Sequence, residues 1–327
     1  MGLGGHSFLS WKASLRRNAL AARDINQFRM SVGPVTVLAG YVVFFLLAMV
    51  GFALLLKRRQ HPKSPFKKET RLLRGPGESL LKKIHDMDDA LPLQLIQAIG
   101  LPLFVCSLAA VVTLKWHLAS TRTTALVFAG LLMASALAAA WWLVNKALSR
   151  ANHYLGYYGE RVVAELLEPL RAQGWHIFHD VQAQVGKERF NVDHVAIGSG
   201  GFFAIETKTR RKGHAIKGRE DYKVFYDGKK LLWPWGDEEP YGVDKAIYRA
   251  KWLETWLKAA TGENIEVKPV LTFPEWYVKE TVVDPRLRVV TSSWLPDVLT
   301  ARRGVLTEKQ IDLLARQLDQ RCRDVEY

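Results

Sequence analysis

Hydrophobic and polar positions divide this chain into two parts. Residues 35–56 and 123–144 are each 22-residue runs without a charged side chain, and residues 98–114 form a 17-residue run that contains Pro102. A helix of 22 residues is about 33 Å long, enough to cross a hydrocarbon core of about 30 Å. The pattern therefore predicts transmembrane helices over residues 35–56, 92–114 and 123–144, the middle one extended upstream to reach spanning length.

Beyond residue 150 the apolar runs become short and alternate as in strands, with stretches of helical period between them. The predicted strands cover residues 175–181, 189–197, 202–208, 222–226, 265–273 and 286–291, and the predicted helices cover residues 157–172, 243–260, 293–300 and 307–323. This order predicts an α/β fold with a mixed sheet, preceded by an α-helical transmembrane region. The expected domains are a basic tail (1–34), a membrane region (35–150) and a soluble domain (151–327).

Two of the predicted strands bring charged residues together. Gly198-Ser199-Gly200-Gly201 is a strong hairpin signal between them. Antiparallel pairing would make Asp193 a neighbour of Glu206, and the two-residue period of a strand places Glu206 and Lys208 on one face, roughly 7 Å apart. Two carboxylates about 4 Å apart repel by roughly 4 kcal/mol at an effective dielectric constant near 20. The pair therefore needs a cation or a shared proton.

A divalent metal is the simplest such cation. Hard oxygen ligands favour Mg²⁺ or Mn²⁺ over zinc, and the two cysteines, Cys106 and Cys322, have no metal-ligand spacing. A metal held by carboxylates can polarise a phosphodiester. Lys208 would then stabilise charge on the phosphate or orient the attacking water.

A basic segment follows the predicted metal strand. From Lys208 to Arg219 there are six basic residues and no acidic one. Arg210, Arg211 and Lys212 are the candidate contacts to substrate phosphates. A solvated loop is the alternative interpretation of the same charges.

Three stretches of this region resemble a known family. Gly159-Glu160-Arg161, Val192-Asp193-His194 and residues 200–208 (Gly-Gly-Phe-Phe-Ala-Ile-Glu-Thr-Lys) are similar to the nuclease-related domain (NERD) family of the PD-(D/E)XK, restriction-endonuclease-like superfamily. The resemblance covers residues 152–275. It implies a restriction-endonuclease-like fold, a metal site formed by Glu160, Asp193 and Glu206, and a catalytic set of Asp193, Glu206 and Lys208.

The chain departs from the family at one motif. Where the family usually has Asn-Pro-x-x-Gln before the next helix, this chain reads Tyr241-Gly242-Val243-Asp244-Lys245. Lys245 in place of the glutamine bears on substrate positioning and not on the metal site.

Each candidate has a structural alternative. Glu206 and Lys208 could form an exposed ion pair worth less than about 1 kcal/mol. Glu160 could be an acidic residue in the first turn of a helix, and Asp193 could form a hydrogen-bonding pair with His194.

The tryptophans are interpreted mainly as packing residues. Trp233 and Trp235 could stack on unpaired bases, but packing beneath a loop is the favoured interpretation. Trp252 and Trp256, four residues apart on a predicted helix, are expected in the core.

The charge distribution separates the two parts of the chain. The formal charge is +14; residues 1–150 have 19 Lys and Arg against 6 Asp and Glu, and residues 151–327 have 27 against 26. The basic half is therefore expected to face anionic lipid. Ten basic residues between Lys57 and Ala90 place that link in the cytoplasm, and three spans then place the C-terminal domain there too.

These observations lead to a functional hypothesis. The chain is expected to be a multi-pass protein of the inner or plasma membrane whose cytoplasmic domain hydrolyses DNA with Mg²⁺ or Mn²⁺, with RNA as another possible substrate. The main alternative is a catalytically inactive nuclease fold that serves as a nucleic-acid-binding or membrane scaffold module. A third possibility is a domain that acts through a partner protein.

Overall fold

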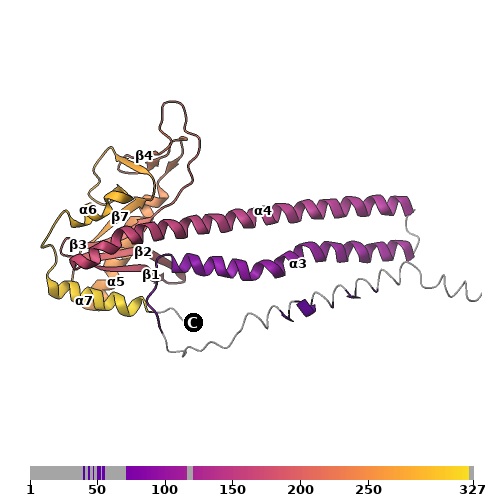
Figure 1. The fold of residues 1–327 in the computed structure, drawn as a ribbon, viewed down its shortest axis with the longest axis horizontal. Coiled ribbons are helices and arrows are strands. Elements are labelled where there is room, and N and C mark those ends of the chain that lie inside the picture. Colours follow the sequence, from indigo (N-terminus) through magenta and orange to yellow (C-terminus); the bar gives the residue numbers. More distant parts are fainter. Residues whose placement is uncertain are drawn as a thin grey trace, which may run out of the picture. The chain divides into compact units, whose positions relative to one another are not determined.

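The computed structural model describes residues 71–115 and 121–323, with scattered positions between residues 40 and 55 (Figure 1). The predicted tail, residues 1–34, lies outside the described residues, and so does most of the predicted membrane helix over residues 35–56. The chain forms two compact units: Met1–Lys63 with Ala90–Asn145, and Ser64–Asp89 with Lys146–Tyr327. The second unit contains every candidate site residue.

Two long helices carry the remaining apolar runs. Helix α3 (Glu78–Lys115) contains the predicted span 92–114, and helix α4 (Thr121–Leu167) contains the predicted span 123–144. In the part of the chain that is described, these are the two helices long and apolar enough to cross a membrane. Many apolar side chains of these two runs are exposed, among them Ile99 of α3 at 55% and Leu126 and Trp141 of α4 at 75% and 73% of full accessibility.

The second unit contains a run of strands and helices close to the predicted pattern. Its elements after α4 are a 3₁₀ helix η1 (Glu168–Gln173), β1 (His176–Val185), β2 (Glu188–Gly198), β3 (Gly201–Thr207), β4 (Lys223–Tyr226), β5 (Leu231–Leu232), β6 (Glu238–Glu239), α5 (Tyr241–Thr261), β7 (Val267–Phe273), β8 (Tyr277–Glu280), β9 (Arg288–Thr291), a 3₁₀ helix η2 (Ser292–Trp294), α6 (Leu295–Thr300) and α7 (Glu308–Arg321). The predicted mixed α/β architecture is confirmed.

The strands form two sheets. The larger has the order β1-β2-β3-β7-β9, with β1, β2 and β3 antiparallel in sequence and β3, β7 and β9 parallel. The smaller sheet has the order β6-β5-β4-β8. In the sequence, β4, β5 and β6 lie between β3 and helix α5, whereas β8 follows β7 and pairs in parallel with β4. Helix α5 therefore connects the parallel strands β3 and β7 and packs on the sheet beside them.

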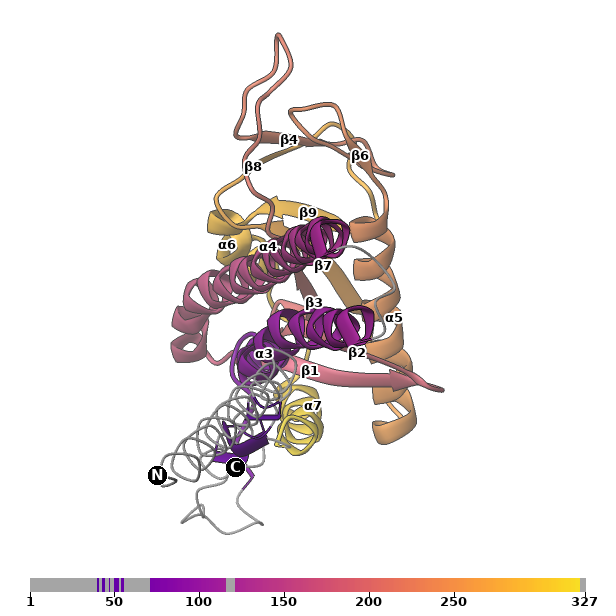
Figure 2. The same ribbon diagram turned by 90° about the vertical axis from the view of Figure 1, so that its right-hand side faces the viewer.

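Helices cover both faces of the larger sheet (Figure 2). One face packs against the end of α4 and against α6, through Leu167, Ile205 and Leu295 among others. The other face packs against α5 and α7, through Phe202, Leu253 and others. Side chains of β2 and β3 that point toward α5 therefore reach the polar residues of that helix.

The turn between β2 and β3 requires small residues. A Cβ atom on Gly200 would lie 2.3 Å from the carbonyl oxygen of Leu299 at the end of α6. Backbone therefore approaches backbone where the hairpin turns, as glycine alone permits. This contact holds the β2–β3 hairpin against α6.

A buried ion pair joins the segment before α3 to the sheet. Asp180 of β1 is fully buried and has a left-handed φ of 48°. Its Oδ2 accepts hydrogen bonds from the Nε of Arg74 (2.8 Å) and from the backbone N and Oγ of Ser79 (2.9 and 2.8 Å), and its Oδ1 accepts one from Asn191. Residues 71–79 are thereby part of the folded second unit.

Candidate functional site

The β2–β3 hairpin places two acidic residues side by side, as predicted. His194 pairs with Ile205 in the antiparallel register, so Asp193 and Glu206 occupy the next facing positions. The side chain of Asp193 is 5% exposed and that of Glu206 is 4% exposed. Asp193 Oδ2 also accepts a hydrogen bond from the backbone N of Thr207 (2.9 Å), which fixes the carboxylate against the end of β3.

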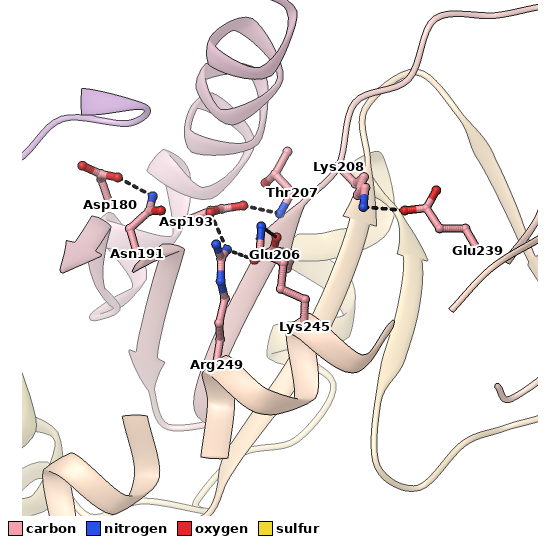
Figure 3. A network of polar contacts seen from close by, with 9 residues as sticks. All are labelled: Asp180, Asn191, Asp193, Glu206, Thr207, Lys208, Glu239, Lys245 and Arg249. Carbon is pink, nitrogen blue, oxygen red and sulfur yellow. Dashed lines mark hydrogen bonds and ion pairs between the residues drawn. The ribbon is translucent and has the colours of Figure 1, made fainter. Parts of the chain in front are cut away.

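The cation beside this pair is an arginine (Figure 3). Arg249 of α5 is 5% exposed, and its Nη1 donates to Asp193 Oδ1 (2.9 Å) and to Glu206 Oε2. Lys245 lies one helical turn earlier on α5, with its Nζ 3.2 Å from Glu206 Oε1. Two positive side chains of α5 therefore compensate two carboxylates of the sheet.

Sequence reasoning missed Arg249, although a signal was present. Arg249 stands among Val243, Ala246, Ala250 and Leu253, which form the buried face of α5. A charged residue on the apolar stripe of an amphipathic helix needs a buried partner. That position alone would have marked Arg249 as a contact of the carboxylates.

Glu160 is the third buried carboxyl group of the region. It lies on α4, is 5% exposed, and its Oε2 has no hydrogen-bond partner among the described residues. Burial raises its pKa well above the usual range, and the neighbouring carboxylates of Asp193, Asp180 and Glu206 raise it further. Burial and the neighbouring carboxylates therefore favour the neutral form of this carboxyl group.

The prediction of a helix that begins near residue 157 is wrong. Helix α4 runs without interruption from Thr121 to Leu167, so Glu160 lies far from its N-terminus. The stabilisation of an acidic residue by a helix dipole is limited to the first turn. A helix-terminal role therefore does not explain this glutamate.

The pKa of Glu206 is also raised. Burial is the largest cause and the adjacent Asp193 carboxylate adds to it, while Arg249 and Lys245 oppose the shift. Despite two cationic neighbours, the charged form of Glu206 is thus disfavoured.

Lys208 follows β3 but makes a different pairing from that expected. Its Nζ lies 2.5 Å from Glu239 Oε1 and 5.3 Å from the centre of the Tyr241 ring. In Figure 3 its side chain points toward Glu239 and away from the cluster of Asp193, Glu206 and Arg249. The exposed Glu206–Lys208 ion pair considered above is not formed.

The three candidate phosphate contacts differ in their surroundings. Arg210 is half-buried, with its guanidinium 4.8 Å from the Trp233 ring and its nitrogens 3.8 Å from Asp237 and 3.6 Å from Glu239. Arg211 and Lys212 are exposed. In this structure Arg210 already has acidic partners, and the other two face solvent.

The packing interpretation of Trp233 is confirmed. Its side chain is fully buried, 5.0 Å from the Trp276 ring and stacked on Trp235 at 5.5 Å. It is therefore not a surface for bases.

The carboxylate oxygens of the site suit a hard divalent cation, but the side chains in this structure are not arranged as a metal centre. Glu160, Asp193 and Glu206 together offer buried carboxylate oxygens, one of them without a hydrogen-bond partner. Across the described residues, no group of three or more His, Cys, Asp or Glu side chains is close enough to hold a metal ion. Arg249 is the group that a metal would have to displace from Asp193 and Glu206.

Comparison with known families identifies the region that contains this site. Residues 155–274 match the nuclease-related domain. The matched segment includes Glu160, Asp193, Glu206 and Lys208, and it ends directly after β7. The resemblance inferred from the three sequence motifs is confirmed at this level, and the domain implies a nuclease-related function.

Neither the curated proteins nor the solved structures contain a significant match to the chain. The match to the nuclease-related domain concerns residues 155–274.

Proposed function

We propose that the nuclease-related domain of this chain hydrolyses phosphodiester bonds of DNA with Mg²⁺ or Mn²⁺. The observation that carries the proposal is the pair of buried carboxylates at facing positions of the β2–β3 hairpin, with Glu160 unpaired nearby and Lys208 at the end of the same strand. Glu160, Asp193 and Glu206 would hold the cation. Once bound, it would polarise a phosphodiester as a Lewis acid.

The side chains of the chain itself have separate roles in this proposal. Lys208 must leave Glu239 to stabilise negative charge on the phosphate. Arg249 would move away from Asp193 and Glu206, because its guanidinium and a metal ion held by the same two carboxylates repel each other. The structure then corresponds to a resting arrangement in which internal cations neutralise the acidic pair.

The proposal is tested by replacing Glu206 with glutamine in the full chain, purified in detergent. The variant keeps the shape of the side chain and removes its charge. Cleavage of a labelled DNA substrate with Mg²⁺ or Mn²⁺ is expected to fall by roughly 10²–10³-fold or more, the range found when a charge-stabilising group is removed.

Glu165→Gln is the matched control, because Glu165 lies on α4 with its side chain 74% exposed. This variant is expected to cleave at the wild-type rate. If the Glu206→Gln variant cleaves DNA at the wild-type rate, the activity belongs to another site or to a contaminant.

One observation favours a second candidate function. Arg249 contacts both Asp193 and Glu206, Lys245 contacts Glu206, and the described part of the chain has no group of three side chains placed to hold a metal ion. Such an arrangement suits a nuclease fold that binds nucleic acid without cutting it. Saturable DNA binding with no cleavage under either metal would support this candidate over the first.

We further propose that α3 and the first part of α4 anchor the domain in a membrane, with the second unit on the cytoplasmic side. Both helices are long and apolar, and many side chains of their apolar runs are exposed; spans of this kind are stable only in lipid or within a protein core. After alkaline carbonate extraction, the chain is expected to remain in the membrane pellet, and release of the chain by carbonate would contradict the anchor.

A reporter fused after residue 327 tests the side of the membrane and should be active in the cytoplasm.

A further inference from the structure

A stripe of aromatic side chains runs along the outer face of α5 and begins at the candidate site. The aromatic stripe consists of Tyr241, Tyr248, Trp252 and Trp256 of α5 and Phe190 of β2. The four α5 positions share one helical face, because they are separated by seven, four and four residues. Lys245 occupies the same face between the two tyrosines. The stripe follows the helix for about 22 Å.

Four of the five rings of the stripe are in contact with one another. Phe190 lies 5.5 Å from the Tyr248 ring and 5.5 Å from the Trp252 ring. Trp252 and Trp256 are nearly parallel, 6.2 Å apart with an interplanar angle of 8°. These four rings form a row, and Tyr241 stands two helical turns before it, on the side of the candidate site.

The outer side of the row faces solvent. Tyr241 is 66% exposed and Tyr248 is 46% exposed. Trp252 and Trp256, expected in the core, lie instead at its margin and are half-buried. Burying such rings fully would be favourable, since each aromatic side chain carries a large apolar area. The exposed ring area of Tyr241 and Tyr248 is therefore accessible to a partner.

Positive side chains lie at both ends of the stripe. At the start, Lys208 lies over the Tyr241 ring and Lys245 contacts Glu206 of the site. At the far end, the Arg321 guanidinium of α7 lies 5.1 Å from the centre of the Trp252 ring and 4.6 Å from that of Trp256. Aromatic rings with cations at both ends match the bases and phosphates of a nucleic-acid strand.

We infer that the aromatic stripe binds a single-stranded nucleic acid and leads it to the candidate site. This inference rests on the proposed nuclease function and narrows its substrate to unpaired strands. Bases in a duplex are stacked on their neighbours, so a row of rings can reach base faces only in a single strand. After residue 150 the chain has 27 basic and 26 acidic residues. This part of the protein therefore does not have the large net positive charge that is typical of duplex binding.

The experiment measures binding in the absence of cleavage. A short fluorescent single-stranded oligonucleotide is titrated with the full chain in detergent and EDTA, and anisotropy gives Kd. Tyr248→Ala is expected to raise Kd about tenfold, the effect of losing one stacked base. Tyr248→Leu, which keeps apolar area but removes the ring, should raise it similarly. A duplex of the same sequence should compete poorly.

Trp294→Ala is the matched control. Trp294 is 48% exposed and belongs to η2, away from the stripe residues in sequence and element. This variant is expected to bind the oligonucleotide as the wild type does. Equal Kd values for wild type, Tyr248→Ala and Tyr248→Leu would overturn the inference. So would a dimer that the Tyr248 variants dissociate, because the stripe would then be a contact between copies.

The inference and the proposed function fail in different ways. Binding that depends on Tyr248 but leads to no cleavage under Mg²⁺ or Mn²⁺ would support the stripe and contradict the nuclease activity. Cleavage that depends on Glu206 but whose KM is unchanged by Tyr248→Ala would support the nuclease and contradict the stripe.

Discussion

Replacing Arg249 with methionine is expected to destabilise the second unit by about 3–5 kcal/mol when no divalent metal is present. Arg249 is buried and its Nη1 donates to both Asp193 and Glu206. Methionine fills similar space but leaves two adjacent buried carboxylates without this partner. The measurement is thermal unfolding of the full chain in detergent, followed by near-ultraviolet circular dichroism in EDTA.

The Tm of the Arg249→Met variant in the presence of Mn²⁺ tests whether the acidic pair binds metal. If Asp193 and Glu206 are metal ligands, Mn²⁺ can take the place of the missing guanidinium and should raise the Tm of Arg249→Met more than that of the wild type. A destabilised variant that Mn²⁺ does not rescue would favour the non-catalytic candidate, in which arginine is the permanent partner.

Arg161→Met is the control for the loss of one arginine. Arg161 is half exposed, and its contact is a surface pair with Glu165 at 3.7 Å. Surface substitutions of this kind usually change stability by less than about 0.5 kcal/mol. An unchanged midpoint for Arg249→Met would show that the buried pairing with Asp193 and Glu206 does not form.

The Arg74→Met variant is expected to have the second large effect, again about 3–5 kcal/mol. Asp180 is fully buried, and removal of the guanidinium leaves its carboxylate with Ser79 and Asn191 as its remaining hydrogen-bond donors. The pKa of Asp180 is already raised by burial, while Arg74 is the main group that opposes this shift. Unfolding in denaturant at neutral pH measures the loss.

A neighbouring exposed lysine provides the control. Lys82→Met, on the exposed side of α3, is expected to leave the unfolding midpoint nearly unchanged. If Arg74→Met behaves like Lys82→Met, the segment before α3 contributes little to the second unit. A large effect would show that the nuclease-related domain needs residues far upstream of its matched segment.

Several elements could be predicted because their signals are local. The hairpin between β2 and β3 follows from a run of glycine and serine between two alternating apolar segments. Helix α5 was predicted over 243–260 and observed over Tyr241–Thr261, since its apolar stripe has the helical period and Gly262 ends it in a left-handed conformation. The facing positions of Asp193 and Glu206 follow directly from that hairpin.

Other features depend on segments distant in sequence. In the smaller sheet β4 pairs with β8. Each of these strands has four residues, and α5 and β7 lie between them in the sequence. Helix α4 runs unbroken from Thr121 to Leu167, across the predicted domain boundary at residue 150, so one helix belongs to both the predicted membrane region and the predicted soluble domain. Lys208 pairs with Glu239, a contact that strand periodicity cannot reveal.

By itself, the sequence determined the apolar runs of α3 and α4, six of the nine strands β1–β9, the nuclease-related motifs and the adjacency of the two acidic residues; β5, β6 and β8 were not predicted. Each of the predicted features follows from residues near one another in the chain, through periodicity, turn chemistry or β-hairpin register. Only the tertiary structure decided which cations meet those acids. Arg249, Lys245 and Glu239 reach the site because α5 crosses the sheet and the smaller sheet folds beside it, and such long-range packing sets the partners of buried charges.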